Sequence, residues 1–204
     1  MSSNFRVDLS GVVELLSRNL YSGPRVFVRE LLQNGVDAIT ARRELQPDCP
    51  ARIRFLLSGR TLTVIDSGVG LTADEAASLL STIGASSKKD EFGLSHSDFL
   101  GQFGIGLLSC FMVSPSIEVF SSSVRAAEPG RGGIARWVGS SDGTWTINDG
   151  ASVAVPAHIE SALSGGGTAI VLEGFPGEQL FSLAALRDVI TSYGRFLEVD
   201  VTLE

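Results

Sequence analysis

The sequence predicts an α/β (α+β) fold, a two-layer sandwich with helices packed on one face of a mixed, mainly antiparallel sheet. Two observations predict it: helix-like segments cluster at the start of the chain, and short strand-like runs joined by tight turns follow them. Strands joined in this way pair antiparallel, and their apolar face needs helices to cover it. The chain has 204 residues, 44% of them hydrophobic, which suits one domain over residues 1–204.

The first half of the chain carries most of the predicted helices. Pro24 near the start of the second helix and the segment QPDCP after it mark the ends of that helix. Thr72 with Glu75 three residues later forms the capping-box pattern of a short third helix. Between these helices, two strands flank a turn at Ser58 and Gly59, and the second strand ends at Asp66. The predicted helices span residues 8–20, 24–45 and 72–83.

The second half is expected to consist mainly of strands. A polar stretch punctuated by glycines, residues 84–106, leads into the apolar, helix-like run GLLSCFMV. Strand-like runs separated by glycine-containing turns follow it. Strands are expected within residues 116–122, 133–140, 143–148 and 167–174, followed by a helix within 180–197 and a last strand within 198–204.

Composition disfavours several kinds of partner. The net charge of −7 argues against non-specific binding to nucleic acid or anionic lipid, because both would be repelled. No segment resembles a signal peptide or a membrane span, so we expect a cytoplasmic protein. Cys49 and Cys110 form no CxxC pair and the two histidines lie far apart, so we expect no metal site built from these residue types.

A stripe of polar side chains is expected on the helix that contains RELLQNGVDAI, residues 29–39. Glu30, Asn34 and Asp37 recur at i, i+4 and i+7, so they lie within about 60° of one another around the helix. Two carboxylates and an amide on one stripe can bind a ligand. Taken alone, they also fit an ordinary solvated face.

The segment VIDSGVGL, residues 64–71, ends an apolar strand with the carboxylate of Asp66 and continues into a turn with Gly68 and Gly70. Glycine lets a ligand approach the backbone closely. The carboxylate can accept a hydrogen bond from an amine such as the amino group of adenine. By itself, the motif also fits an ordinary hairpin turn.

The segment GQFGIGLLSCF places Gly101, Gly104 and Gly106 directly before a helix-like run. Backbone N–H groups at such a helix start suit a phosphate. The spacing G-x-x-G-x-G is not that of the dinucleotide fingerprint, and the chain contains no G-x-x-x-x-G-K-[ST] motif. A flexible turn is the alternative for this cluster alone.

Taken in order, the three motifs resemble the ATP site of the GHKL superfamily, which includes gyrase, Hsp90, histidine kinases and MutL. The segments FVRELLQNGVDAI, IDSGVGLT, STIGASS and GQFGIGLLSCFMV are most similar to the N-terminal ATP-binding domain of the Hsp90 chaperones. The resemblance runs from about Val12 to the end of the chain and includes GGGTAIVLEGF. It implies the Bergerat fold and an N-terminal position in a longer chaperone.

The resemblance also implies roles for individual residues. Glu30 would be catalytic, orienting and deprotonating the attacking water, and Asn34 would bind Mg²⁺. Asp66 would bind the adenine amino group with support from Thr168, and Asp37 would help to hold the adenine or phosphate network. The remaining nucleotide contacts would come from Gly70, Leu71 and the phosphate-wrapping backbone of Gly101, Gln102, Phe103, Gly104, Ile105 and Gly106.

Residues 84–103 match the mobile lid of the family, a polar segment expected to close over bound nucleotide. Three residues depart from the Hsp90 pattern: Ala85 replaces a usual lysine, Leu79 a usual asparagine, and Leu71 a usual methionine. The replacement at Ala85 is expected to change contacts with the lid or the phosphates, whereas those at Leu79 and Leu71 alter the shape of the pocket more than its chemistry.

The function implied by the resemblance is Mg²⁺-dependent binding of ATP or ADP and slow ATP hydrolysis, coupled through lid closure to the handling of client proteins. Co-chaperones and a homodimer are implied for the full-length protein, and a weakly active monomer for the isolated domain. Two alternatives stay open: a module that senses nucleotide without hydrolysing it, and a GHKL ATPase coupled to DNA, as in topoisomerases or mismatch repair. The acidic balance disfavours the second.

Overall fold

The computed structural model describes residues 11, 24–80, 106–125 and 133–204. Within them, seven strands form one sheet: β1 Arg52–Ser58, β2 Thr61–Asp66, β3 Ser116–Ser122, β4 Ala135–Ser140, β5 Trp145–Asn148, β6 Gly167–Glu173 and β7 Asp200–Leu203. Their order across the sheet is β5-β4-β3-β6-β2-β1-β7. Neighbouring strands are antiparallel except β1 and β7, which are parallel, so the predicted mixed, mainly antiparallel sheet is confirmed.

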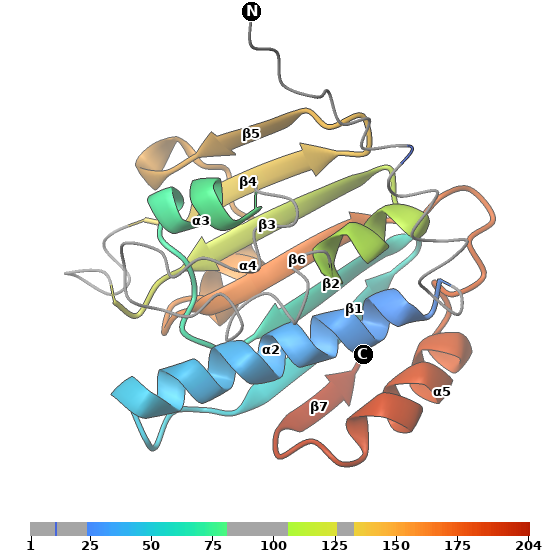
Figure 1. Cartoon of the computed structure of the whole chain (residues 1–204), viewed down its shortest axis with the longest axis horizontal. Coiled ribbons are helices and arrows are strands. Elements are labelled where there is room, and N and C mark those ends of the chain that lie inside the picture. Colours follow the sequence, from blue (N-terminus) through green and yellow to red (C-terminus); the bar gives the residue numbers. More distant parts are fainter. Residues whose placement is uncertain (1–10, 12–23, 81–105, 126–132) are drawn as a thin grey trace, which may run out of the picture.

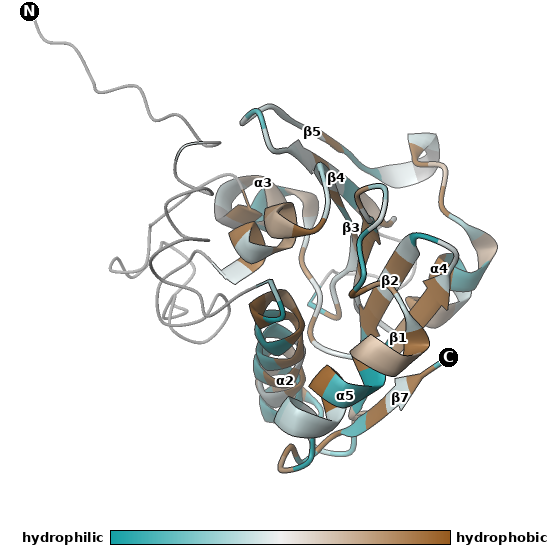
Figure 2. Ribbon diagram, turned by 90° about the vertical axis from the view of Figure 1, so that its right-hand side faces the viewer, coloured by the Kyte–Doolittle hydropathy of each residue, from teal (hydrophilic) through white to brown (hydrophobic). Residues whose placement is uncertain are grey.

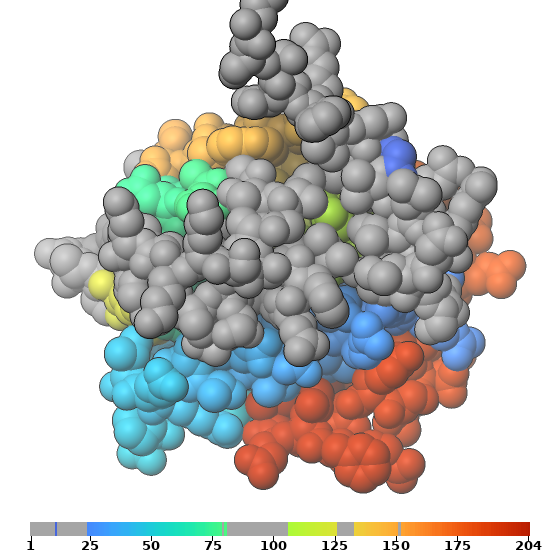
Figure 3. Space-filling model, viewed as in Figure 1, coloured from blue at the N-terminus to red at the C-terminus, as the bar shows by residue number. Residues whose placement is uncertain are grey.

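The helices of the described residues are α2 Val26–Leu45, α3 Ala73–Leu80, α4 Ala157–Ala162 and α5 Leu183–Gly194, with two 3-10 helices, η3 Gly106–Met112 and η4 Gly150–Ser152. Figure 1 shows α2, α3 and α5 in front of the sheet and α4 behind it. Figure 2 shows the same layers from the side. In Figure 3, α2 and α5 lie side by side along the lower part of the front face. Within this part of the chain, no helix has the length and apolar character needed to span a membrane.

Side chains alternate between the two faces of each strand, and this alternation decides which residues face α2. Val64 of β2 belongs to the core cluster that includes α2, whereas Ile65 belongs to a second cluster on the opposite face. Asp66, two residues after Val64, therefore faces α2. Thr168 faces the same way, because Ile170, two residues further along β6, packs against the α2 cluster. The alternation thus directs two polar side chains into the space under α2.

The larger core cluster holds α2 firmly on the sheet. Phe27 of α2 and Phe55 of β1 are both fully buried in it, and the Phe27 ring lies 6.2 Å from the ring of Phe181. Gly35 lets the helix approach β1 closely, because a Cβ there would lie 2.7 Å from Ile53 Cδ1. Asn34, which directly precedes Gly35 on α2, is therefore held close to the strands.

Most predicted elements are confirmed, several of them with shorter bounds, and three features add to the prediction. The helix-like run after the glycine cluster forms the 3-10 helix η3. The short helices η4 and α4 were not predicted, and Ile159 of α4 packs with Ile65 and Phe120 on the face opposite α2. The predicted helix at residues 8–20 and the predicted lid at residues 84–103 lie outside the described residues.

Candidate functional site

The carboxylate of Asp66 lies at the end of β2, on the face covered by α2. Asp66 pairs with Ile53 of β1 and with Thr168 of β6, so its backbone is fixed between two neighbouring strands. The Gly68 N–H donates a hydrogen bond of 2.8 Å to Asp66 Oδ1. Burial raises the pKa of Asp66 to about 7, although this hydrogen bond and the charge of Arg42 oppose the rise. The carboxyl group can therefore change its protonation state near neutral pH.

The turn after Asp66 requires glycine at two positions. Gly70 has a φ of +66°, and a Cβ there would lie 2.0 Å from the carbonyl oxygen of Ser122. At Gly68, a Cβ would lie 2.4 Å from Ala38 Cβ on α2. The turn is thus confined between α2 and the end of β3, which fixes the position of the Asp66 side chain.

Two hydroxyl groups extend the polar surface beside Asp66. Ser121 Oγ of β3 and Thr168 Oγ1 of β6 lie 2.9 Å apart, and Ser121 Oγ also accepts a hydrogen bond of 2.8 Å from the Leu71 N–H. Thr168 was predicted to contribute to the site, whereas Ser121 was missed. The signal was the alternation along SIEVFSS, which places Ser121 on the same face as the core residue Val119.

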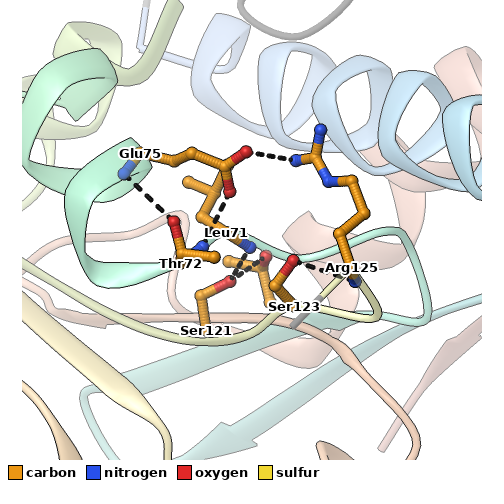
Figure 4. A network of polar contacts seen from close by, with 7 residues as sticks. Leu71, Thr72, Glu75, Ser121, Ser123 and Arg125 are labelled. Carbon is orange, nitrogen blue, oxygen red and sulfur yellow. Dashed lines mark hydrogen bonds and ion pairs between the residues drawn. The ribbon is translucent and has the colours of Figure 1, made fainter. Parts of the chain in front are cut away.

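Figure 4 shows how Ser121, one of the two hydroxyl residues, connects to the start of α3. The Thr72 N–H donates to Glu75 Oε2 over 2.8 Å, and the Glu75 N–H donates to Thr72 Oγ1 over 3.3 Å, which confirms the predicted capping box. Glu75 Oε1 forms an ion pair of 2.8 Å with Arg125. Because Leu71 is bonded to Ser121, the start of α3 is held against the strand ends that carry the hydroxyl groups.

Asn34 of α2 lines the same cavity as Asp66 and Thr168. Its Oδ1 atom is buried and has no hydrogen-bond partner within the described residues. A buried amide oxygen without a donor is costly, so this atom is suited to bind a cation or a donor from a ligand. Asp37, predicted on the same stripe, accepts a hydrogen bond of 2.7 Å from Gln33 and is not among the residues that line the cavity.

Glu30, one helical turn before Asn34, lies beside the first residue of η3. A Cβ at Gly106 would lie 2.6 Å from Glu30 Oε2, so glycine makes room for the carboxylate. Glu30 Oε1 pairs with Arg29 Nη2 at 2.6 Å, and the Glu30 side chain is only 16% exposed. One oxygen of this carboxylate is therefore neutralised by a cation, while the other lies close to the glycine motif.

One cavity brings the polar groups together. Its polar lining comes from Asn34, Asp66 and Thr168. The other lining residues are mostly apolar: Ala38, Val69, Gly70, Leu71, Leu80, Leu107, Val119 and Ile170. An apolar cavity with a few convergent polar groups is typical of a site for a small molecule.

The predicted site residues are only partly brought together in this cavity. Gly70 and Leu71, which the sequence suggested as nucleotide contacts, line it together with the three polar residues, and Gly106 lies beside Glu30. The apolar wall was missed, although the strand alternation at Val119 and Ile170 carried the signal. The predicted phosphate-binding residues Gly101, Gln102, Phe103, Gly104 and Ile105 lie outside the described residues.

Known proteins are similar to this chain over nearly its whole length. Residues 21–134, more than half of the chain, match the family described as histidine kinase-, DNA gyrase B-, and HSP90-like ATPase. Over 98% of its length the chain is 30% identical to the mitochondrial heat shock protein 75 kDa of Bos taurus and 30% identical to the chaperone protein HtpG of Burkholderia ambifaria. It is 28% identical, again over 98% of its length, to the chaperone protein HtpG of Verminephrobacter eiseniae.

These matches cover 28%, 32% and 31% of the three relatives, so the chain spans about a third of the length of the curated proteins it matches. The family match covers α2 and β2, which supply the carboxylates and the amide described above. The chain therefore belongs to the histidine kinase-, DNA gyrase B- and HSP90-like ATPase family, and carries an ATP-binding domain of the Hsp90 type.

Proposed function

We propose that this chain binds ATP and ADP together with Mg²⁺ in the cavity under α2, and that it hydrolyses ATP slowly. The observation that carries the proposal is the presence of two groups in one cavity: the Asp66 carboxylate and the Asn34 Oδ1 atom, which has no partner in the described part of the chain. The first suits the amino group of adenine, and the second suits a hard cation. Residues 1–204 would act as one nucleotide-binding domain, with residues 84–103 as its lid.

The base would bind at the Asp66 end of the cavity. The ionised carboxyl of Asp66 would accept a hydrogen bond from the adenine amino group, with the hydroxyl of Thr168 beside it. Ser121, 2.9 Å from Thr168 Oγ1, would hold that hydroxyl in place. Gly70 and Leu71 line the same cavity and would shape the surface against the base.

Asn34 fits the role of a magnesium ligand. Its amide oxygen is a hard donor, is buried, and lies in the cavity without a competing hydrogen bond from the described residues. Mg²⁺ in nucleotide sites uses few protein ligands and takes the rest from phosphate and water. When bound, the ion would neutralise phosphate charge that this acidic chain would otherwise repel. Asp37 would contribute only indirectly, because it is not among the residues that line the cavity.

Glu30 would act as the general base. It would take a proton from the attacking water while the water oxygen bonds to the γ-phosphorus and the bond from that phosphorus to the β–γ bridging oxygen breaks. Because Arg29 holds Oε1, Glu30 would either leave this ion pair or act through Oε2, which lies near Gly106. The phosphates would be held by the backbone of Gly101, Gln102, Phe103, Gly104, Ile105 and Gly106.

Client handling belongs to a longer protein in this proposal, because the chain spans only about a third of its relatives. The names of the relatives, a heat shock protein and two chaperones, support a chaperone role. We propose lid closure, co-chaperone binding and a homodimer for that longer protein, and a monomer for the isolated domain. A cytoplasmic location is proposed from the sequence alone. The relatives do not support it, because one of them is named as mitochondrial.

A nucleotide sensor that does not hydrolyse ATP is the second candidate. The observation in its favour is the Arg29–Glu30 ion pair of 2.6 Å, which occupies one oxygen of the proposed base. In a sensor, this pair would persist with nucleotide bound, and the bound state alone would recruit a partner.

Replacing Glu30 with Ala tests the hydrolytic role. We expect ATP turnover to fall by about 10²–10⁴-fold, because the base is lost, while ADP affinity stays within about threefold. Phosphate release and calorimetry on the longest native chain measure the two quantities. Glu173→Ala is the matched control, since Glu173 is exposed and pairs with Arg60.

Two results would count against hydrolysis by Glu30. Nucleotide binding without any turnover in the wild-type longest chain would favour the sensor. An equal loss of ADP binding and turnover in Glu30→Ala would show that the residue holds the ligand rather than activating water.

A further inference from the structure

Arg42 is a buried guanidinium near the end of α2 to which the proposed nucleotide site assigns no role. It is only 7% exposed, and the acceptors of its hydrogen bonds are all neutral. Nη1 donates to the Ser67 carbonyl over 3.0 Å, Nη2 to the Gly165 carbonyl over 2.7 Å, and Nε to Gln46 Oε1 over 3.1 Å. A buried cation held by two backbone carbonyls fixes both segments of chain to α2.

The first of these segments is the turn that determines the position of the Asp66 carboxylate. Ser67 directly follows Asp66, and the next residue, Gly68, donates its N–H to Asp66 Oδ1 over 2.8 Å. Two hydrogen bonds therefore connect Arg42 to the carboxylate: one from Arg42 to the Ser67 carbonyl, and one from the N–H of the same peptide group, at Gly68, to Asp66. Movement of the Ser67 carbonyl would move the donor that orients Asp66.

The second segment leads into β6. Gly165 precedes Gly167, where a Cβ would lie only 2.2 Å from the Asp66 carbonyl oxygen, so this loop packs directly on the end of β2. Thr168, the hydroxyl neighbour of Asp66 in the sheet, comes next in the chain. Arg42 thus connects the two loops that flank the polar end of the cavity.

We propose that Arg42 is a positioning residue for adenine recognition, which holds these two loops so that the Asp66 carboxylate meets the amino group of the base. The inference rests on the proposed nucleotide-binding function of the cavity. The charge of Arg42 acts in the same direction: burial raises the pKa of Asp66 to about 7, and the guanidinium opposes that rise. It thereby favours the form of the carboxyl that accepts the hydrogen bond.

Inosine diphosphate differs from ADP at the group that Asp66 would bind, because inosine carries an oxygen where adenine carries the amino group. The ratio of ADP affinity to inosine diphosphate affinity therefore measures the hydrogen bond between Asp66 and that amino group. A merely structural Arg42 would change both affinities alike and leave the ratio constant. We expect Arg42→Met to lower the ratio about tenfold, chiefly by weakening ADP binding. The ratio in Arg42→Lys should lie between those of the wild type and Arg42→Met, because lysine keeps the charge but does not form the forked contact to both carbonyls.

Arg43→Met is the matched control. Arg43 is the next residue of the same helix, and its Nη2 contacts the exposed Glu198 carbonyl at 3.3 Å, away from the cavity. This variant should keep the wild-type ratio. Circular dichroism and thermal unfolding establish that each variant is folded at the assay temperature.

A constant ratio in Arg42→Met, whether both affinities fall together or neither changes, would overturn the inference. If Arg42→Met does not fold, a wild-type ratio in Arg42→Lys overturns it instead, and a lowered ratio supports it. Failure of the wild-type chain to bind ADP would have a different meaning, since it would refute the proposed function and the inference with it.

Discussion

At the scale of single residues, we expect the pKa of Asp66 to make nucleotide affinity depend on pH. Burial raises this pKa to about 7 in the ligand-free protein. In the proposed site the ionised carboxyl accepts the amino group of adenine, so nucleotide binding would compete with protonation as the pH falls below 7. We expect ADP affinity to fall about tenfold from pH 8 to pH 6, following the ionised fraction of Asp66. Calorimetry at constant ionic strength and saturating Mg²⁺ measures this change.

The Asp66→Asn variant separates the effect of protonating Asp66 from the effect of protonating the nucleotide phosphates. The variant keeps the phosphate titration but lacks the carboxyl, so its weaker ADP affinity should vary less over the same pH range. An equally steep pH dependence in Asp66→Asn would show that Asp66 does not set the profile.

The sequence motifs identified the polar residues that line the cavity better than the residues that hold these side chains in place. Asp66 and Asn34 were predicted from their motifs, and both line the cavity. The burial of Arg42 was not predicted, because a cation on a helix next to Arg43 has the pattern of an exposed face. Its acceptor at Gly165 lies 123 residues further along the chain, so only the folded structure brings them together.

At the scale of the elements, the turn between β2 and α3 depends on the absence of a side chain at Gly70. We expect Gly70→Ala to lower the free energy of unfolding by at least about 3 kcal/mol, because the Cβ would lie 2.0 Å from the Ser122 carbonyl and the backbone would have to shift. Urea unfolding measures the change, and ADP binding should weaken with it.

Gly59→Ala is the matched control for this turn. Gly59 has a similar φ of +58°, but a Cβ there would have nothing within 4 Å. Only the strain of the left-handed backbone remains, which costs about 1 kcal/mol. Equal destabilisation by the two substitutions would show that the contact with β3 does not confine the turn.

The helices and strands that have a strong local sequence signal were predicted. The alternation and glycine turns predicted the strands, and Thr72 with Glu75 predicted the capped start of α3. The short helix α4 was missed because only Ile159 of its six residues is buried, which leaves no helical period to detect. The 3-10 geometry of η3 is likewise not specified by an apolar run of residues.

At the scale of the whole molecule, the order of the strands in the sheet brings the polar residues of the cavity together. β6 lies between β3 and β2, so Ser121, Thr168 and Asp66 come from three neighbouring strands. In the chain, β6 begins 45 residues after β3 ends, with β4 and β5 between them. The sequence predicted a mainly antiparallel sheet but not this order, because pairing between distant strands leaves no local signal. The Ser121–Thr168 hydroxyl pair was therefore not predictable, although Thr168 was.

The central claim for the whole domain is that a nucleotide binds through Asp66 at one end and through a cation on Asn34 at the other. Calorimetry of ADP binding, with Mg²⁺ or with EDTA, on the wild-type chain and on Asn34→Ala tests it most directly. We expect the wild type to bind ADP at least about tenfold more tightly with Mg²⁺, and Asn34→Ala to lose most of that gain while keeping its metal-free affinity. Equal ADP affinity with and without Mg²⁺ in the wild type, or an undiminished gain in Asn34→Ala, would contradict the claim.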